Sequence, residues 1–161
     1  MKTHDILTAL QSVAAGVTVN AAPAFAAVAV YDADQPQTQA DILQETDGRF
    51  CLIVHGGNDL QMERAGRETR GALTVKASLF VSNSHWGADG ENTPASASAP
   101  LDVVDALVAA LTAHANDKFW QRVASVERYS SPATGTADGR LIYHVAVECA
   151  VRERIIIPLG R

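Results

Sequence analysis

The chain has 161 residues, of which 47% are hydrophobic and 19% charged, which is enough to bury one core but too little for two well-filled domains. This composition excludes global disorder, and two cysteines are too few for a disulfide scaffold. No apolar run approaches the roughly 20 residues that span a bilayer, so we do not expect an integral membrane protein.

Acidic residues are unevenly distributed along the chain. Eighteen Asp and Glu against thirteen Lys and Arg give a formal net charge of −5. The excess lies within residues 31–48, which contain no basic residue and five acidic ones: Asp32, Asp34, Asp41, Glu45 and Asp47. The rest is balanced, so neither the basic surface of a nucleic-acid binder nor a basic membrane-surface helix is present. We interpret the acidic stretch as a solvated loop, with contact to a basic partner as the alternative.

The N-terminal segment is apolar with helical spacing. Its recurring apolar residues are Ile6, Leu10, Ala14 and Val17. This spacing predicts a helix over residues 4–15 that ends near Gly16. Lys2 and the small-residue triplets within residues 22–26 also resemble a secretory signal with its cleavage site. Cleavage there would cut into an expected strand, so we favour a structural helix.

Three stretches in the first half of the chain are predicted to be strands. Residues 25–31 form a short apolar run. Residues 49–55 are continuously apolar, which is typical of a central strand covered on both faces, and Gly56-Gly57 is expected to end it. In residues 71–82 apolar side chains alternate with mostly polar ones, so this strand should have one core face.

The second half of the chain predicts one helix and two strands. Pro100 opens the helix, because proline suits the first helical turn. The apolar face of this helix comprises Leu101, Val104, Leu107, Val108 and Leu111. Strands are expected over residues 122–129 and 140–152, and the turn formers in residues 130–139 suit a hairpin between them.

The resulting order, α-β-β-β-α-β-β, predicts the α+β class. We expect one domain over residues 1–161, with a mainly antiparallel or mixed sheet and two helices packed on one face. The predicted core consists of Leu73, Val75, Leu79, Val104, Leu107, Leu111, Val145 and Val147.

No residue pattern points to catalysis, a cofactor or a metal. The five histidines, His4, His55, His85, His114 and His144, lack any metal-ligand spacing with one another or with Cys, Asp or Glu. The sequence His55-Gly56-Gly57 resembles an esterase oxyanion loop, but no G-x-S-x-G nucleophile motif accompanies it. Glycine-rich dinucleotide and phosphate loops are absent as well. We therefore predict a protein without enzymatic activity.

Both cysteines fall inside predicted strands. Cys51 and Cys149 are not part of any CxxC or Cys/His cluster. Isolated cysteines in apolar strands behave as small buried hydrophobes, and this favours a reduced cytoplasmic protein. A disulfide between the two is the alternative.

Two long connections carry the candidate contact residues. Residues 58–70 far exceed a hairpin turn and carry Arg64, Arg67 and Arg70, so the segment is a floppy loop, an ordinary solvated loop or a projecting hairpin arm. Residues 83–99 form a long polar loop that carries His85 and Trp86. Trp86 is either folded back as a lid or displayed to a partner.

Two more aromatic residues follow the second helix. We expect Phe119 and Trp120 to anchor that helix to the sheet.

The whole pattern resembles the tail terminator and tail-completion proteins of tailed phages and prophages, Mu-like tail proteins included. The resemblance covers about residues 4–157. Most of it lies in the strands at 50–54 and 73–81 and in the Asp-bearing helix at 101–111.

The resemblance implies a structural virion protein of the tail and neck, assembled in the host cytoplasm. Such proteins form a ring, commonly a hexamer, that caps the head-proximal end of the tail tube, stops tube polymerisation and offers the neck its attachment surface. The implied partners are other copies of the chain, the tail tube protein, the neck or head-closure protein and, in contractile tails, the sheath. DNA would pass through the ring without sequence-specific binding, and no membrane or cofactor is involved.

Three alternatives remain at this point. The chain is a head-closure, neck or other minor tail component of the same size, a small cytoplasmic enzyme with an unrecognised site, or an unrelated binding domain.

Overall fold

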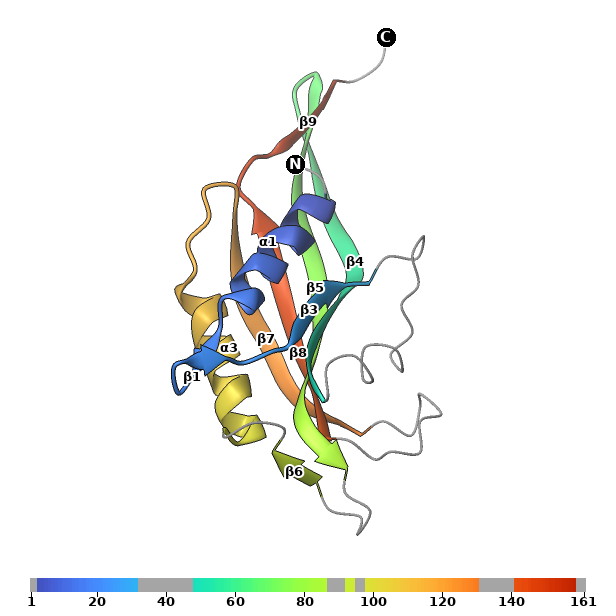
Figure 1. Cartoon of the computed structure of the whole chain (residues 1–161). Helices are drawn as coiled ribbons and strands as arrows, with labels where there is room; N and C mark the ends of the chain where they lie inside the picture. Colours follow the sequence, from blue (N-terminus) through green and yellow to red (C-terminus); the bar gives the residue numbers. More distant parts are fainter. Residues whose placement is uncertain (1–2, 32–47, 87–91, 95–97, 131–140, 159–161) are drawn as a thin grey trace.

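The structure, a computed structural model, describes residues 3–31, 48–86, 92–94, 98–130 and 141–158 (Figure 1). The elements are α1 (Thr3–Ala15), β1 (Thr18–Val19), β2 (Ala22–Pro23), β3 (Ala27–Val30), β4 (Arg49–Ala65), β5 (Glu68–Trp86), β6 (Asn92–Pro94), α3 (Pro100–Ala113), β7 (Phe119–Ser130), β8 (Leu141–Val151) and β9 (Ile155–Pro158). The predicted elements are all present. Strands β1, β2, β6 and β9 are additions that the sequence did not predict.

One mixed sheet forms the body of the protein. Its strand order is β3-β4-β5-β8-β7, in which β3 and β4 are parallel and the other neighbours antiparallel. Strand β9 pairs with the first residues of β5 and β6 with its last. The predicted α+β class is therefore confirmed, and β5 is the strand on which the sheet is built.

The two helices within the described residues, α1 and α3, pack on one face of this sheet (Figure 1). Helix α1 buries Ile6, Leu7, Leu10 and Ala14, and helix α3 buries Val103, Val104, Leu107 and Leu111. They meet the alternating apolar residues of β5 and β8, because stripes of period 3.6 and period two leave water only by packing together. All eight predicted core residues belong to this cluster, with Leu73 partly buried at its margin.

The opposite face of the sheet carries a smaller apolar cluster. It consists of the buried Phe50, Leu52 and Ile142, with Ala29, Val54 and Phe80 partly buried against them. The first part of β4 is therefore buried on both faces, as its continuous apolar run predicted. Cys51 and Cys149 are buried and unpaired, which confirms them as small core residues.

The expectation that Gly56-Gly57 ends the strand is wrong. Strand β4 passes through both glycines and continues to Ala65. A bulge between His55 and Gly57 adds one residue, and Gly57 adopts a φ of 113° that side-chain-bearing residues rarely reach. Glycine here bends the strand instead of ending it, because β5 offers pairing partners beyond the bulge.

Two predicted core contacts are also wrong. Leu101 is 56% exposed, and Val103 occupies the buried position in the first turn of α3. Trp120 is 51% exposed on the face away from the helices, where the Arg152 guanidinium lies 5.0 Å from its ring centroid, whereas Phe119 is buried as expected. Adjacent strand residues point to opposite faces, so only one of these two aromatic side chains reaches the helices.

Three predicted connections lie partly or wholly outside the described residues. The loop at 83–99 is partly regular structure, because β5 continues to Trp86 and β6 folds back to pair with it. The acidic stretch 32–47 and the turn at 131–140 lie outside the described residues. Strands β7 and β8 nevertheless pair up to Ser130 and Leu141, so the predicted hairpin between them is confirmed.

Candidate functional site

The segment at residues 58–70, termed the arm below, is a regular hairpin. The pairing of β4 with β5 continues without a break to Ala65 and Glu68. Gly66 adopts a φ of 65°, which suits a two-residue turn at the tip. The arm extends beyond helix α1, with β9 beside it (Figure 1). Of the alternatives left open for this segment, the structure selects the projecting hairpin.

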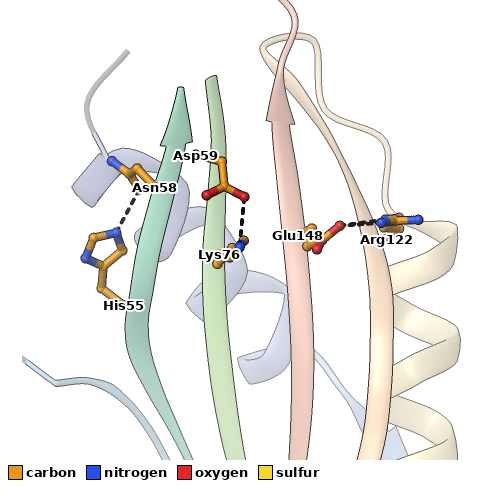
Figure 2. A network of polar contacts seen from close by, with 6 residues as sticks. All are labelled: His55, Asn58, Asp59, Lys76, Arg122 and Glu148. Atoms are coloured by element: carbon orange, nitrogen blue, oxygen red, sulfur yellow. Dashed lines mark hydrogen bonds and ion pairs between the residues drawn. The ribbon is translucent and has the colours of Figure 1, made fainter. Parts of the chain in front are cut away.

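A chain of side-chain hydrogen bonds fixes the base of the arm. His55 Nε2 lies 2.8 Å from Asn58 Oδ1, across the bulge (Figure 2). Asn58 Nδ2 in turn donates to Thr3 Oγ1 at 3.0 Å. Thr3 is the first residue of α1. These contacts therefore connect the base of the arm to the N-terminal end of the helix that covers the sheet.

The two faces of the arm differ in chemistry. Leu60 and Met62 lie opposite Leu73 and Gly71, on the face that carries the helices farther along the sheet. They are 48% and 42% exposed, because the arm has passed the end of α1. Exposed apolar side chains grouped on one face are typical of a contact surface.

The other face of the arm is charged. Glu63 accepts a hydrogen bond from the Arg154 guanidinium at 2.7 Å. Lys76 Nζ lies 2.8 Å from a carboxylate oxygen of Asp59, as Figure 2 shows. The hydrogen bond and negative charge of Asp59 raise the pKa of Lys76. All four side chains are solvent-exposed, and such pairs contribute little to stability. They keep this face polar.

The structure divides the predicted contact residues into two groups. Arg64, Arg67 and Arg70 all lie on the arm. His85 and Trp86 lie at the opposite end of β5, where their backbones pair with Thr93 and Asn92. At roughly 3.3 Å per strand residue, Arg70 and Trp86 lie about 50 Å apart along the strand. These residues therefore belong to two separate surfaces.

The three arginines of the arm are not equivalent. Arg70 lies 3.6 Å from the Glu68 carboxylate and lines an open hollow of about 330 Å³ together with Met62 and Arg154. Arg64 and Arg67 are exposed, and neither has an ion pair among the described residues. Two guanidinium groups are thus available to a partner.

Sequence reasoning missed the apolar face of the arm. Leu60 and Met62 are two residues apart in a charged stretch, and this spacing was the available signal. Gly71 is part of the same feature, because a Cβ atom there would lie 2.6 Å from Met62 Sδ and 3.0 Å from Leu60 Cδ1. The missing side chain lets both apolar side chains lie across the neighbouring strand.

One serine–histidine pair lies on the sheet face away from the helices. His144 Nε2 is 2.8 Å from Ser78 Oγ, and the imidazole stacks on Phe80 with ring centroids 5.1 Å apart. Ser78 sits in the middle of β5, between β4 and β8, so the nearby backbone amides are used by the sheet. A nucleophilic serine needs free donors for the developing oxyanion, whereas the described backbone beside Ser78 is paired on both sides within the sheet.

The described part of the chain was also searched for a metal site and for a membrane-spanning helix. Among its His, Cys, Asp and Glu side chains, no three are grouped so as to hold a metal ion. No described helix has the length and apolar character needed to cross a membrane. Comparison of the sequence with known protein families and with curated proteins finds no match.

Proposed function

We propose that this protein is a structural virion component, a tail terminator of a tailed phage or prophage. Copies of the chain form a ring, commonly a hexamer, on the head-proximal end of the tail tube. The ring ends tube polymerisation and gives the neck its attachment surface. The protein acts by binding, in the host cytoplasm during assembly and afterwards in the tail and neck of the virion.

The observation that carries this proposal is the arm. A ring of identical subunits needs two different, complementary surfaces on each subunit. The arm supplies one, with Leu60 and Met62 exposed on one face and Arg64 and Arg67 without ion-pair partners among the described residues. A hairpin that extends past the helices adds no core, so its exposed apolar and arginine side chains are suited to contacts outside the subunit.

Electron microscopy of the purified protein, alone and mixed with its tail tubes, tests the assignment. The expected result is rings with a central hole and a ring on one end of each tube, with tube growth halted. Tubes of unaltered length without caps would contradict a terminator. Binding to filled heads but not to tubes would instead identify the head-closure alternative.

A triple substitution of Arg64, Arg67 and Arg70 by glutamate tests the role of the arm. The variant should fold, because exposed substitutions usually change stability by less than about 0.5 kcal/mol. It should fail to form rings or to dock on tubes, since uncompensated interface charges cost roughly 2–5 kcal/mol each. Triple substitution by lysine is the matched control, which retains the charge. A glutamate variant that still supports wild-type numbers of infectious particles would show that these arginines make no functional contact.

A further inference from the structure

The main sheet has two open edges, at opposite sides. Strand β3 covers only Phe50–Ile53 of β4, and no other described strand pairs with the outer edge of β4 along the arm. At the far side, β7 pairs with β8 alone among the described strands. Open edges present unpaired backbone groups that bind another strand.

The outward backbone groups of β4 follow from its register. Ile53 O accepts a hydrogen bond from the backbone N–H of Tyr31, the residue after β3, so Ile53 directs its backbone groups away from β5. Orientation alternates along an antiparallel strand, and the bulge shifts the alternation by one residue. Beyond the bulge, the residues with outward amide and carbonyl groups are Asn58, Leu60, Met62 and Arg64.

The same alternation, followed across β5 and β8, identifies the outward groups of β7. They belong to Gln121, Val123, Val126 and Arg128. Val126 lies opposite Val145, which is buried under the helices, so the outward residues of β7 also face the helix side. Each open edge therefore combines free backbone groups with side chains on the same face of the sheet.

Exposed apolar residues gather at these two edges. Leu60 and Met62 on β4 and Val126 on β7 are 48%, 42% and 43% exposed, and all three lie on the helix side. The acids of the arm pair within the subunit, Asp59 with Lys76 and Glu63 with Arg154, so charge adds no match between the edges. The two edges match each other in their exposed apolar side chains and in the face that carries them.

We propose that the outer edge of the β4 arm pairs with the outer edge of β7 of a second copy of this chain. Strands β4 and β7 run in opposite directions within one sheet. A second copy placed in the same orientation thus brings them together antiparallel, with both helix faces on one side. Backbone hydrogen bonds join the sheets, and Leu60 and Met62 pack beside Val126.

This contact is head to tail, because each copy contributes a different edge to each of its two neighbours. Such a contact closes into a ring when the rotation between copies is a simple fraction of a turn. The inference deepens the proposed function by naming the surface between ring subunits, and only the closure of the ring rests on that function. Pairing of two copies through their β4 edges alone would make a symmetric dimer and no ring.

Disulfide cross-linking between two differently tagged variants tests the pairing. One variant carries a cysteine on the arm (Leu60→Cys or Met62→Cys), and the other carries one on β7 (Val126→Cys or Arg128→Cys). Paired strands bring Cβ atoms within about 5 Å, close to disulfide geometry, and the four combinations allow for register. Cys51 and Cys149 are buried, so they add little background.

The expected result is a cross-linked dimer only when an arm variant is mixed with a β7 variant under mild oxidation. An arm variant that cross-links to itself alone would overturn the proposal in favour of the symmetric pairing. Rings seen by microscopy without arm-to-β7 cross-links in any combination would overturn it while leaving the proposed function standing. Cross-links in a protein that never caps tubes would keep the pairing and reject the terminator.

A backbone variant separates strand pairing from side-chain packing. Met62→Pro removes an outward amide without removing any hydrogen bond to β5, because that amide points away from β5. We expect its self-association to weaken by about tenfold or more relative to Met62→Ala, which loses the same side chain but keeps the amide. Circular dichroism checks that both variants fold. Equal self-association of the two variants would overturn backbone pairing at this edge.

Discussion

The base and the arm of one hairpin show how differently the same two strands behave. In the base, formed by residues 49–55 of β4 and their partners on β5, Phe50 and Ile53 are fully buried on opposite faces. In the arm, Leu60 and Met62 stay about half exposed although the pairing is just as regular. The difference lies in what covers the sheet, since helix α1 begins at Thr3, beside the base of the arm, and does not extend over the arm (Figure 1).

The apolar side chains of the base serve the stability of the fold, whereas those of the arm are suited to binding a partner. Apolar side chains in the base leave water when the chain folds, and this burial stabilises the fold. Those of the arm remain in water until something binds them. Substitutions in the two regions should therefore have opposite consequences, large effects on folding in the base and large effects on assembly in the arm.

Thiol reactivity should give the largest contrast. Burial raises the pKa of Cys51, in the base, to about 12, and that of Cys149 likewise to about 12. Compared with an ordinary thiol, a pKa of about 12 leaves about a thousandfold less reactive thiolate near pH 8. In a Met62→Cys variant, a thiol reagent should modify the new cysteine of the arm quickly. It should modify the two native cysteines, Cys51 and Cys149, only after unfolding. Rapid labelling of Cys51 in the folded protein would contradict the buried base.

Because both thiols are buried, the free energy of unfolding should depend on pH. In the unfolded chain the thiols ionise near their ordinary pKa, whereas in the folded protein they stay protonated until about pH 12. The unfolded state then binds fewer protons than the native state, so stability should fall as pH rises from about 9 towards 12. A Cys51→Ala, Cys149→Ala variant, followed by denaturant unfolding across this range, should show a shallower fall. An identical slope would contradict the assignment to the thiols.

Truncation of one apolar side chain in each region should cause very different losses of stability. Ile53→Ala should destabilise the protein by about 2–5 kcal/mol, because Ile53 is fully buried and leaves a cavity. Leu60→Ala should cost less than about 1 kcal/mol, because its side chain is half in water. Urea unfolding of both variants measures the difference. Equal losses would mean that the arm is as tightly packed as the base.

The bulge that joins base to arm should show an intermediate effect. Gly57→Ala should cost about 1–3 kcal/mol, because a φ of 113° strains any residue with a Cβ atom. Gly56→Ala is the matched control, since its Cβ would meet the Lys76 backbone at an ordinary 3.4 Å. Thermal unfolding of the two variants should therefore differ although they are adjacent. Equal stability would show that the bulge relaxes without glycine.

The charged face of the arm should show the smallest effect. Asp59 raises the pKa of Lys76, so the pair stabilises the fold while Lys76 is protonated, and this contribution disappears as pH rises through the raised pKa. An Asp59→Asn variant should bring the pKa of Lys76, followed by NMR, back towards its ordinary value. Added salt should weaken the pair in the wild type, because both groups are exposed. An unchanged Lys76 titration would contradict the pairing.

Sequence reasoning identified the elements better than it judged their surroundings. The alternation in residues 71–82 predicted the core face of β5, and the helical spacing of Leu107 and Leu111 predicted their burial. The same reasoning failed at Leu101 and Trp120, which are apolar but exposed. Apolar character says which side chains gain from burial, but not whether another element is placed to bury them.

The candidate site shows the same division. The length and charge of residues 58–70 marked the arm, and Arg64, Arg67 and Arg70 were recognised on it. The apolar face and the distance between the arm and Trp86 were not predicted, because both depend on the register of β4 against β5. The signal at Leu60 and Met62 was only two residues long, too short to distinguish a strand face from chance.

The period of apolar residues was enough to predict the α+β class, because this period sets helix or strand locally and both kinds of element must bury one face. The sequence pattern did not show that Gly56-Gly57 bends a strand or that β4 and β5 extend beyond the helices. Nor did it show that two sheet edges are left open among the described residues. Those features arise from pairing between segments far apart in the chain. A local pattern carries no information about where a neighbouring element ends, and only the folded arrangement decides which apolar faces are covered.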